Sequence, residues 1–162
     1  MKKINVTYAC AAAEEFPGCA DLLYSYSEMN VVARTTSLFG VATGMALAKS
    51  DVLVVDESVL ALDGLQAVQS VHATYPRLKL LLVYEININN SMIECLSIGI
   101  RGVLERKSCI SLLRRAIPAL HAGDVWMPRG VIQSLRNQLA FNDGRSSWYD
   151  FSSNMPGCGK MN

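Results

Sequence analysis

The segment DVLVVDESVLALDGL, residues 51–65, decides the fold of this chain. Val52–Val55 is apolar at successive positions, which is typical of a strand in a parallel sheet covered by helices on both faces. Asp56 follows directly, and the apolar spacing then changes to one that favours a helix over Leu62–Tyr75. The segment therefore predicts a buried strand, an acid at the edge of a sheet and a covering helix.

The same alternation runs through most of the chain. Five strands are predicted, at Ile4–Ala9, Val31–Ala33, Val52–Val55, Leu78–Val83 and Gly102–Leu104. Five helices are predicted between and after them, at Pro17–Ser27, Ser37–Ala48, Leu62–Tyr75, Asn89–Ile98 and Ser108–Ala122. This order indicates an α/β fold, a doubly wound (βα)5 sandwich of three layers around a central parallel five-stranded sheet.

The C-terminal part has a different composition. We expect one compact domain over residues 1–124 and an extension over residues 125–140 that contains a helix, Arg129–Leu139. Residues 141–162 are rich in Ser, Asn and Gly without sustained periodicity, so a linker or disordered tail is predicted there. Pro118 lies inside the last helix of the domain and is expected to bend it.

Composition excludes several classes of protein. The 162 residues are 51% hydrophobic and carry a formal net charge of +1, which is too balanced for general attraction to nucleic acid or anionic membrane. No apolar window is long enough to cross a membrane. Five cysteines without a CxxC pair predict a cytoplasmic protein with reduced thiols. His72 and His121 are too few for a histidine metal site and are expected to be exposed on helices.

An ordered set of short segments resembles the receiver domains of bacterial response regulators, and the NarL/FixJ (LuxR-type) subfamily in particular. Asp63-Gly64 follows Asp56 at the spacing of that family, where these two residues belong to a loop. The similarity continues through Gly99–Leu104, Arg115–Ile117 and His121–Pro128. It covers most of the chain before residue 138 and is weakest in the first fifty residues. The resemblance implies a flavodoxin-like (CheY-like) fold, a part in two-component signal transduction and phosphorelay, and Asp56 as the phosphoacceptor position.

Two positions that hold a metal ion in receivers differ here. The family's paired carboxylates fall on Cys10 and Ala11, or on Ala9 and Cys10 if the alignment shifts by one residue. Magnesium prefers oxygen ligands anchored by carboxylates, so no Mg²⁺ and no other cofactor is predicted. Glu14 and Glu15 lie downstream and are interpreted as solvated acids before a helix.

Two further positions of the pocket also differ. Tyr84 stands where receivers have Ser or Thr, and its distant hydroxyl indicates a packing role. Arg106 stands where receivers have Lys and could pair with Asp56, because its planar fork matches a carboxylate. Lys107 could take this place if the alignment slips by one residue.

These departures predict a non-enzymatic, degenerate receiver that acts in transcription regulation through protein contacts, without phosphorylation. Two alternatives remain open. One is a working receiver that is phosphorylated on Asp56 with altered metal ligation. The other is a sensor that binds a small molecule in the space near Cys10, Ala11 and Tyr84.

The resemblance also implies partners. We expect a homodimer built on the fourth helix, fifth strand and last helix, or on the first and last helices, where Arg114 and Arg115 would face acids such as Glu94 or Glu105. A histidine kinase or another regulator is a further candidate. Direct DNA binding is not expected, because the residues after Pro128 are too few for the helix-turn-helix domain of that subfamily.

Overall fold

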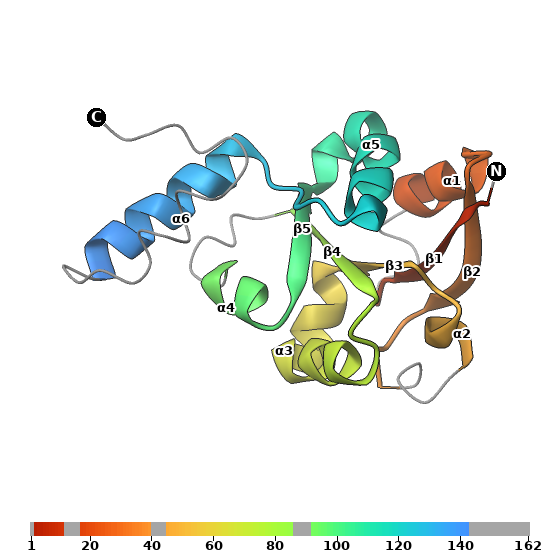
Figure 1. The fold of residues 1–162 in the computed structure, drawn as a ribbon, viewed down its shortest axis with the longest axis horizontal. Helices are drawn as coiled ribbons and strands as arrows, with labels where there is room; N and C mark the ends of the chain where they lie inside the picture. The colour runs from red at the N-terminus through yellow and green to blue at the C-terminus, as the bar shows by residue number, and fades with distance from the viewer. Residues whose placement is uncertain (1, 12–16, 40–44, 86–91, 143–162) are drawn as a thin grey trace.

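A central sheet of five parallel strands, in the order β2-β1-β3-β4-β5, organises the computed structural model, which describes residues 2–11, 17–39, 45–85 and 92–142 (Figure 1). The strands are β1 (Ile4–Ala9), β2 (Met29–Thr35), β3 (Val52–Asp56), β4 (Lys79–Tyr84) and β5 (Ile100–Glu105). All five predicted strands are present. The edge strands β2 and β5 are longer than predicted, because their ends carry polar residues that interrupt the apolar pattern.

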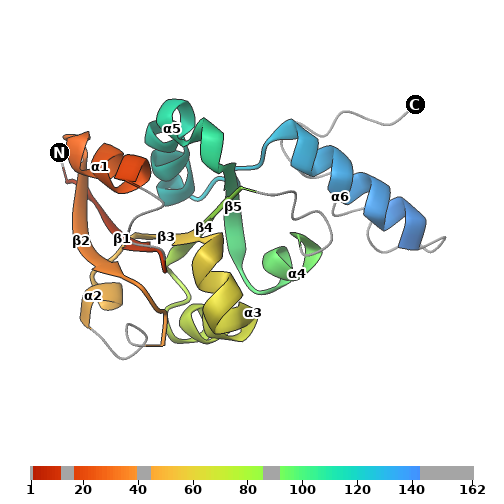
Figure 2. The same ribbon diagram turned by 180° about the vertical axis from the view of Figure 1, so that it is seen from behind.

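Helices cover both faces of this sheet. α1 (Pro17–Ser25) and α5 (Cys109–Ala122) lie on one face, and α2 (Met45–Ala48), α3 (Glu57–Thr74) and α4 (Met92–Ser97) lie on the other (Figures 1 and 2). Each face encloses its own apolar core, and the residues of β3 and β4 alternate between the two. The chain therefore has the predicted three-layer α/β fold, which is flavodoxin-like.

Two helices begin at other residues than predicted. α3 begins at Glu57, because the side chain of Asp56 caps it, and its helical geometry is interrupted at Gly64, where φ is 76° and ψ is 170°. Ser37–Phe39 is not helical, and α2 covers only Met45–Ala48. Residues 40–44 of the helix predicted at Ser37–Ala48 lie outside the described ranges. The first residues of the helix predicted at Asn89–Ile98 do so too.

Helix α5 is a single helix with Pro118 inside it, and it ends at Gly123 with φ at 100°. The chain then turns along the free edge of β5. Trp126 forms a parallel bridge with Gly102, where its N–H donates to the Arg101 carbonyl at 3.0 Å and its carbonyl accepts from the Val103 N–H at 2.8 Å. The extension is therefore hydrogen-bonded to the sheet at its first residues.

The predicted C-terminal helix is present as α6 (Arg129–Asn142) and runs outward past α4 in both views. Val131 and Leu135 of α6 are buried in the core on the α3 and α4 face. The predicted tail, residues 143–162, lies outside the described residues. Within the described parts of the chain, no helix combines the length and the apolar character that a membrane crossing needs.

Candidate functional site

Asp56 lies at the carboxyl end of β3, in the middle of the sheet, and its side chain is only 1% exposed. It is also the N-cap residue of α3, where its Oδ1 atom accepts a hydrogen bond from the backbone N–H of Ser58 at 2.9 Å. A carboxylate at a helix N-terminus satisfies a free N–H group and is stabilised by the helix dipole. Oδ1 of Asp56 therefore stabilises the N-terminus of α3.

The other oxygen of Asp56, Oδ2, accepts a hydrogen bond from Arg106. Arg106 begins a short 3-10 helix, η1 (Arg106–Ser108), directly after β5, and its Nη2 atom lies 2.8 Å from Asp56 Oδ2. Parallel pairing brings the carboxyl ends of β3 and β5 to the same edge of the sheet, with β4 between them. The alternative with Lys107 is not the arrangement seen, because Lys107 is 78% exposed and pairs with Glu105 at 2.9 Å.

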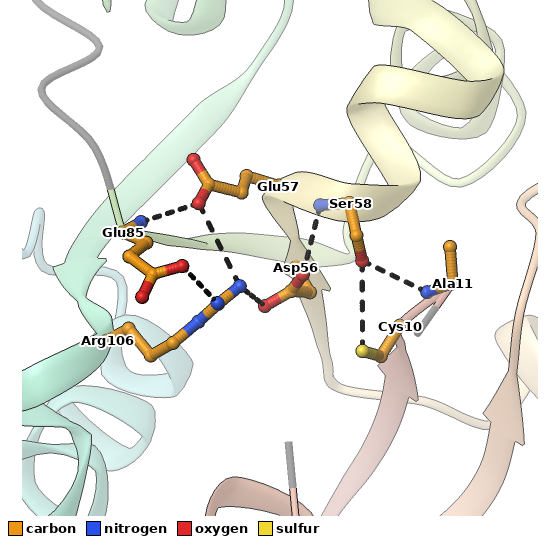
Figure 3. A network of polar contacts seen from close by, with 7 residues as sticks. All are labelled: Cys10, Ala11, Asp56, Glu57, Ser58, Glu85 and Arg106. Carbon is orange, nitrogen blue, oxygen red and sulfur yellow. Dashed lines mark hydrogen bonds and ion pairs between the residues drawn. The ribbon is translucent and has the colours of Figure 1, made fainter. Parts of the chain in front are cut away.

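Two more acids contact the guanidinium of Arg106, as Figure 3 shows. Nη1 of Arg106 lies 2.7 Å from Glu85 Oε2, and Nη2 lies 3.8 Å from Glu57 Oε1. The backbone N–H of Glu85 also donates to Glu57 Oε1 at 2.8 Å. Sequence reasoning missed both glutamates, although each directly follows the last residue of a central strand.

The charges around Arg106 determine its protonation. Partial burial alone would lower the pKa of Arg106, but the hydrogen bond and charge of Asp56, with Glu85 and Glu57, raise it above its usual value. The guanidinium is therefore a fixed positive charge beside Asp56.

Cys10 and Ala11, the two residues that follow β1, lie on the other side of Asp56 (Figure 3). The backbone N–H of Ala11 donates to Ser58 Oγ at 3.1 Å, and Cys10 Sγ lies 3.8 Å from the same oxygen. No carboxylate is present at Cys10 or Ala11, and Glu14 and Glu15 lie outside the described residues. In the described residues, no group of three or more His, Cys, Asp or Glu side chains is placed to hold a metal ion. Glu57 and Glu85 contact Arg106.

Tyr84 packs into the core on the α3 and α4 face and is 8% exposed. Burial raises its pKa, and the charge of Glu105 adds to this effect. This is the predicted packing role. Cys10 belongs to the core on the opposite face, and Ala11 packs against the same core as Tyr84.

Asp63 and Gly64 have structural positions away from Asp56. Oδ2 of Asp63 accepts hydrogen bonds from Ser37 Oγ at 3.0 Å and from the N–H of Leu38 at 2.6 Å. Asp63 therefore holds the segment after β2 against α3. Gly64 follows at the interruption of α3, where its positive φ and extended ψ favour glycine.

The four residues predicted for a dimer surface are Glu94, Glu105, Arg114 and Arg115. Arg114 forms an ion pair with Glu28 of the same chain, and its guanidinium lies 5.5 Å from the centre of the Tyr26 ring. The guanidinium of Arg115 lies 6.0 Å from the centre of the Trp126 ring. Glu105 pairs with Lys107, and Glu94 lies in the first turn of α4.

The prediction of two exposed histidines is half wrong. His121 is exposed, but His72 is only partly so, because it packs against Gly99. A Cβ atom at Gly99, where φ is 102°, would lie 2.5 Å from the His72 ring. His72 is therefore a contact between α3 and the turn before β5.

Both oxygens of Asp56 accept a hydrogen bond, Oδ1 from the Ser58 N–H and Oδ2 from the Arg106 guanidinium. Asp56 therefore joins the start of α3 to the segment that follows β5.

Neither a protein-family model nor a curated protein matches the sequence. Solved structures do match. The RcsB response regulator of Salmonella typhimurium is 21% identical, with a TM-score of 0.73 over 84% of this chain and 68% of that chain. A LuxR-family two-component response regulator from Aurantimonas is 16% identical, with a TM-score of 0.75 over 86% of this chain and 99% of that chain. The response regulator ChrA of a heme-sensing two-component system is 18% identical, with a TM-score of 0.68 over 91% of this chain and 70% of that chain. This chain therefore has the fold of response-regulator receiver domains.

Proposed function

We propose that the chain is an atypical receiver module that regulates through protein contacts without phosphorylation of Asp56. The observation that supports the proposal is the ion pair of Arg106 with the buried carboxylate of Asp56 at the carboxyl end of the sheet. Charge-assisted pairs of this kind, with a second hydrogen bond from Ser58, are stable when buried and fully hydrogen-bonded.

The charge balance around Asp56 supports this proposal. In a working receiver, a metal ion balances the acids of the pocket, whereas here Arg106 contacts Asp56, Glu57 and Glu85 at once. Because Glu85 directly follows β4 and Asp56 ends β3, Arg106 also links the ends of these two strands. The module would therefore hold one arrangement of this edge without an added ligand.

The proposed partners are proteins. The near-neutral net charge of +1 gives no general attraction to DNA, so we place the module in cytoplasmic transcription regulation as a partner of a histidine kinase or of another regulator. RcsB is described as dimers bound to DNA. For this chain we propose a homodimer that forms without a phosphate signal.

Incubation with acetyl phosphate and Mg²⁺ tests the proposal, with intact-mass measurement as the readout. We expect no added phosphoryl group on the unsubstituted chain, and no change when beryllofluoride replaces acetyl phosphate. Asp56→Asn is the negative control. Stoichiometric modification that disappears in Asp56→Asn would overturn the proposal and favour the working receiver with altered metal ligation.

A restored pocket provides the matched positive control. The triple substitution Cys10→Asp, Ala11→Asp and Arg106→Lys returns the carboxylates and the lysine of working receivers to their positions. We expect this variant to gain Mg²⁺ binding and one phosphoryl group on Asp56. Arg106→Lys alone should gain neither, because it supplies no metal ligand.

A further inference from the structure

Basic side chains gather at the amino ends of the central strands, at the opposite edge of the sheet from Asp56. Five of them come from the segments that lead into or begin β1, β3 and β4, and we call them the amino-edge patch: Lys2, Lys3, Lys49, Arg77 and Lys79. Lys79 is half-buried, and the other four are exposed. The site described above uses none of them.

Hydrogen bonds hold these segments side by side. Asn5, two residues after Lys3, donates from its side-chain Nδ2 to the Lys49 carbonyl at 3.0 Å. The carbonyl of Asn5 accepts from the Asp51 N–H at 2.8 Å, and the Asp51 carbonyl accepts from the Lys79 N–H at 3.1 Å. Because neighbouring strands lie about 4.8 Å apart, the patch extends over roughly 10 Å from β1 through β3 to β4.

The positive charge of the patch exceeds the negative charge beside it. Within the described residues, none of the five basic side chains lies within 4.0 Å of a carboxylate oxygen. Of the acids beside these segments, Glu28 forms its ion pair with Arg114, and Asp51 Oδ2 accepts from the Asn5 N–H at 2.9 Å. The five bases with Asp51 sum to +4, so the rest of the chain, for a total of +1, sums to −3. The net charge of the whole chain therefore does not describe this edge.

The same edge also presents hydrogen-bond acceptors. α3 ends at Thr74, three residues before Arg77, and the last carbonyl groups of a helix have no partner inside it. These carbonyls carry partial negative charge. A molecule that fits this edge therefore has negative groups for the cations and N–H donors for the carbonyls. A polypeptide rich in Asp and Glu has both, whereas the phosphodiester backbone of a nucleic acid has acceptors only.

We propose that the amino-edge patch binds an acidic segment of a partner protein. Four of its five cations are exposed, so each ion pair with such a segment is weakened by salt and several must act together. The inference rests on the proposed function only in that the module acts through protein contacts. It involves neither Asp56 nor phosphorylation, and the acetyl phosphate test has no bearing on it.

Fluorescence anisotropy with a labelled oligoglutamate peptide and the full chain tests the proposal. We expect saturable binding at low ionic strength that weakens as salt is added, and no binding of an oligoglutamine peptide of the same length. In NMR spectra of the unsubstituted protein, the peptide should shift the amide signals of residues 2–5, 49–51 and 77–79. Absence of binding, or shifts confined to other residues, would overturn the proposal.

Two charge reversals form a matched pair of variants. Lys49→Glu and Lys107→Glu change the net charge equally, and both lysines are exposed, but Lys107 follows β5 at the carboxyl end of the sheet. We expect Lys49→Glu to weaken binding of the peptide by about threefold or more, and Lys107→Glu to leave it within about twofold. Equal weakening by both variants would mean that only net charge matters and would overturn the patch. Tighter binding of a DNA duplex than of the peptide would overturn the choice of an acidic protein segment.

Discussion

Nη2 of Arg106, directly after β5, lies 2.8 Å from Oδ2 of Asp56 at the end of β3, and β4 lies between these two strands. The pair joins residues 50 positions apart in the chain. Because the Asp56 side chain is buried and that of Arg106 is 18% exposed, the pair is shielded from water more than a surface ion pair is.

Removal of Arg106 should therefore destabilise the protein. Arg106→Ala leaves the buried carboxylate of Asp56 without its cation, and breaking one side of a buried pair costs about 3 kcal/mol. Urea unfolding monitored by circular dichroism measures this difference. The double variant Asp56→Asn with Arg106→Ala should recover part of the loss, since no charge is then left buried. An unchanged unfolding midpoint in Arg106→Ala would show that the pair contributes nothing.

Two substitutions of Asp56 should differ from each other. Asp56→Asn removes the charge but keeps a side-chain oxygen that can cap α3, whereas Asp56→Ala removes both. Loss of an N-cap side chain costs about 1 kcal/mol. We expect Asp56→Ala to unfold at lower denaturant concentration than Asp56→Asn, and both below the unsubstituted protein. Equal midpoints for the two variants would mean that the contact with the Ser58 N–H does not stabilise α3.

The pair of Glu28 and Arg114 should give a pH dependence at the surface. The hydrogen bond from Arg114 holds the pKa of Glu28 below its usual value. A lowered folded-state pKa contributes stability that is complete above the unfolded-state pKa and is lost as the pH falls through the folded-state pKa. NMR titration of Glu28 should give a pKa that rises in Arg114→Gln. A Glu28 pKa that does not change in this variant would contradict the pairing.

Gly64 should resist substitution. A side chain at φ 76° and ψ 170° adopts a backbone region that only glycine occupies readily, so Gly64→Ala should cost about 2 kcal/mol. Open space surrounds the added Cβ position, so the cost comes from the backbone rather than from a clash. Gly130→Ala in α6 is the matched control, since Gly130 also has open space but no positive φ. Thermal unfolding should separate the two variants.

The proposed homodimer should have the same mass with and without a phosphodonor. Light scattering over a concentration series checks this, because a population set by concentration alone does not respond to acetyl phosphate. Charge reversal in Arg115→Glu should shift the equilibrium toward monomer if α5 is part of the interface. A protein that remains monomeric at high micromolar concentration would contradict the homodimer.

The resemblance to receivers allowed a pair of Asp56 with Arg106 or Lys107, because these residues fall at or beside the lysine position after the fifth strand. The structure contains the pair with Arg106. The sequence could not predict the parts of Glu57 and Glu85, since side-chain direction just beyond a strand has no periodic pattern. The helix predicted over Ser37–Ala48 was wrong at its start, because Asp63, 25 residues later, takes the N–H of Leu38.

Contacts between residues far apart in the sequence leave no pattern in the residues around either partner. Glu28 and Arg114 are 86 residues apart, and nothing near either residue indicates the other. The resemblance placed Asp63 and Gly64 in a loop after Asp56, whereas in this fold Asp63 holds another segment and Gly64 interrupts a helix. Family spacing thus located these residues in sequence without giving their contacts.

The bridge of Trp126 to Gly102 pairs part of the β5 edge of the sheet, so that the two edge strands differ in their free backbone groups. A strand border with free N–H and C=O groups can pair with a strand from another molecule, which is one route to aggregation. On the β5 side, Trp126 uses the Arg101 carbonyl and the Val103 N–H. On the β2 side, no strand within the described residues pairs with the outer border. Pairing with a strand from a second molecule would therefore compete with Trp126 at the middle of β5, but with no described strand at β2.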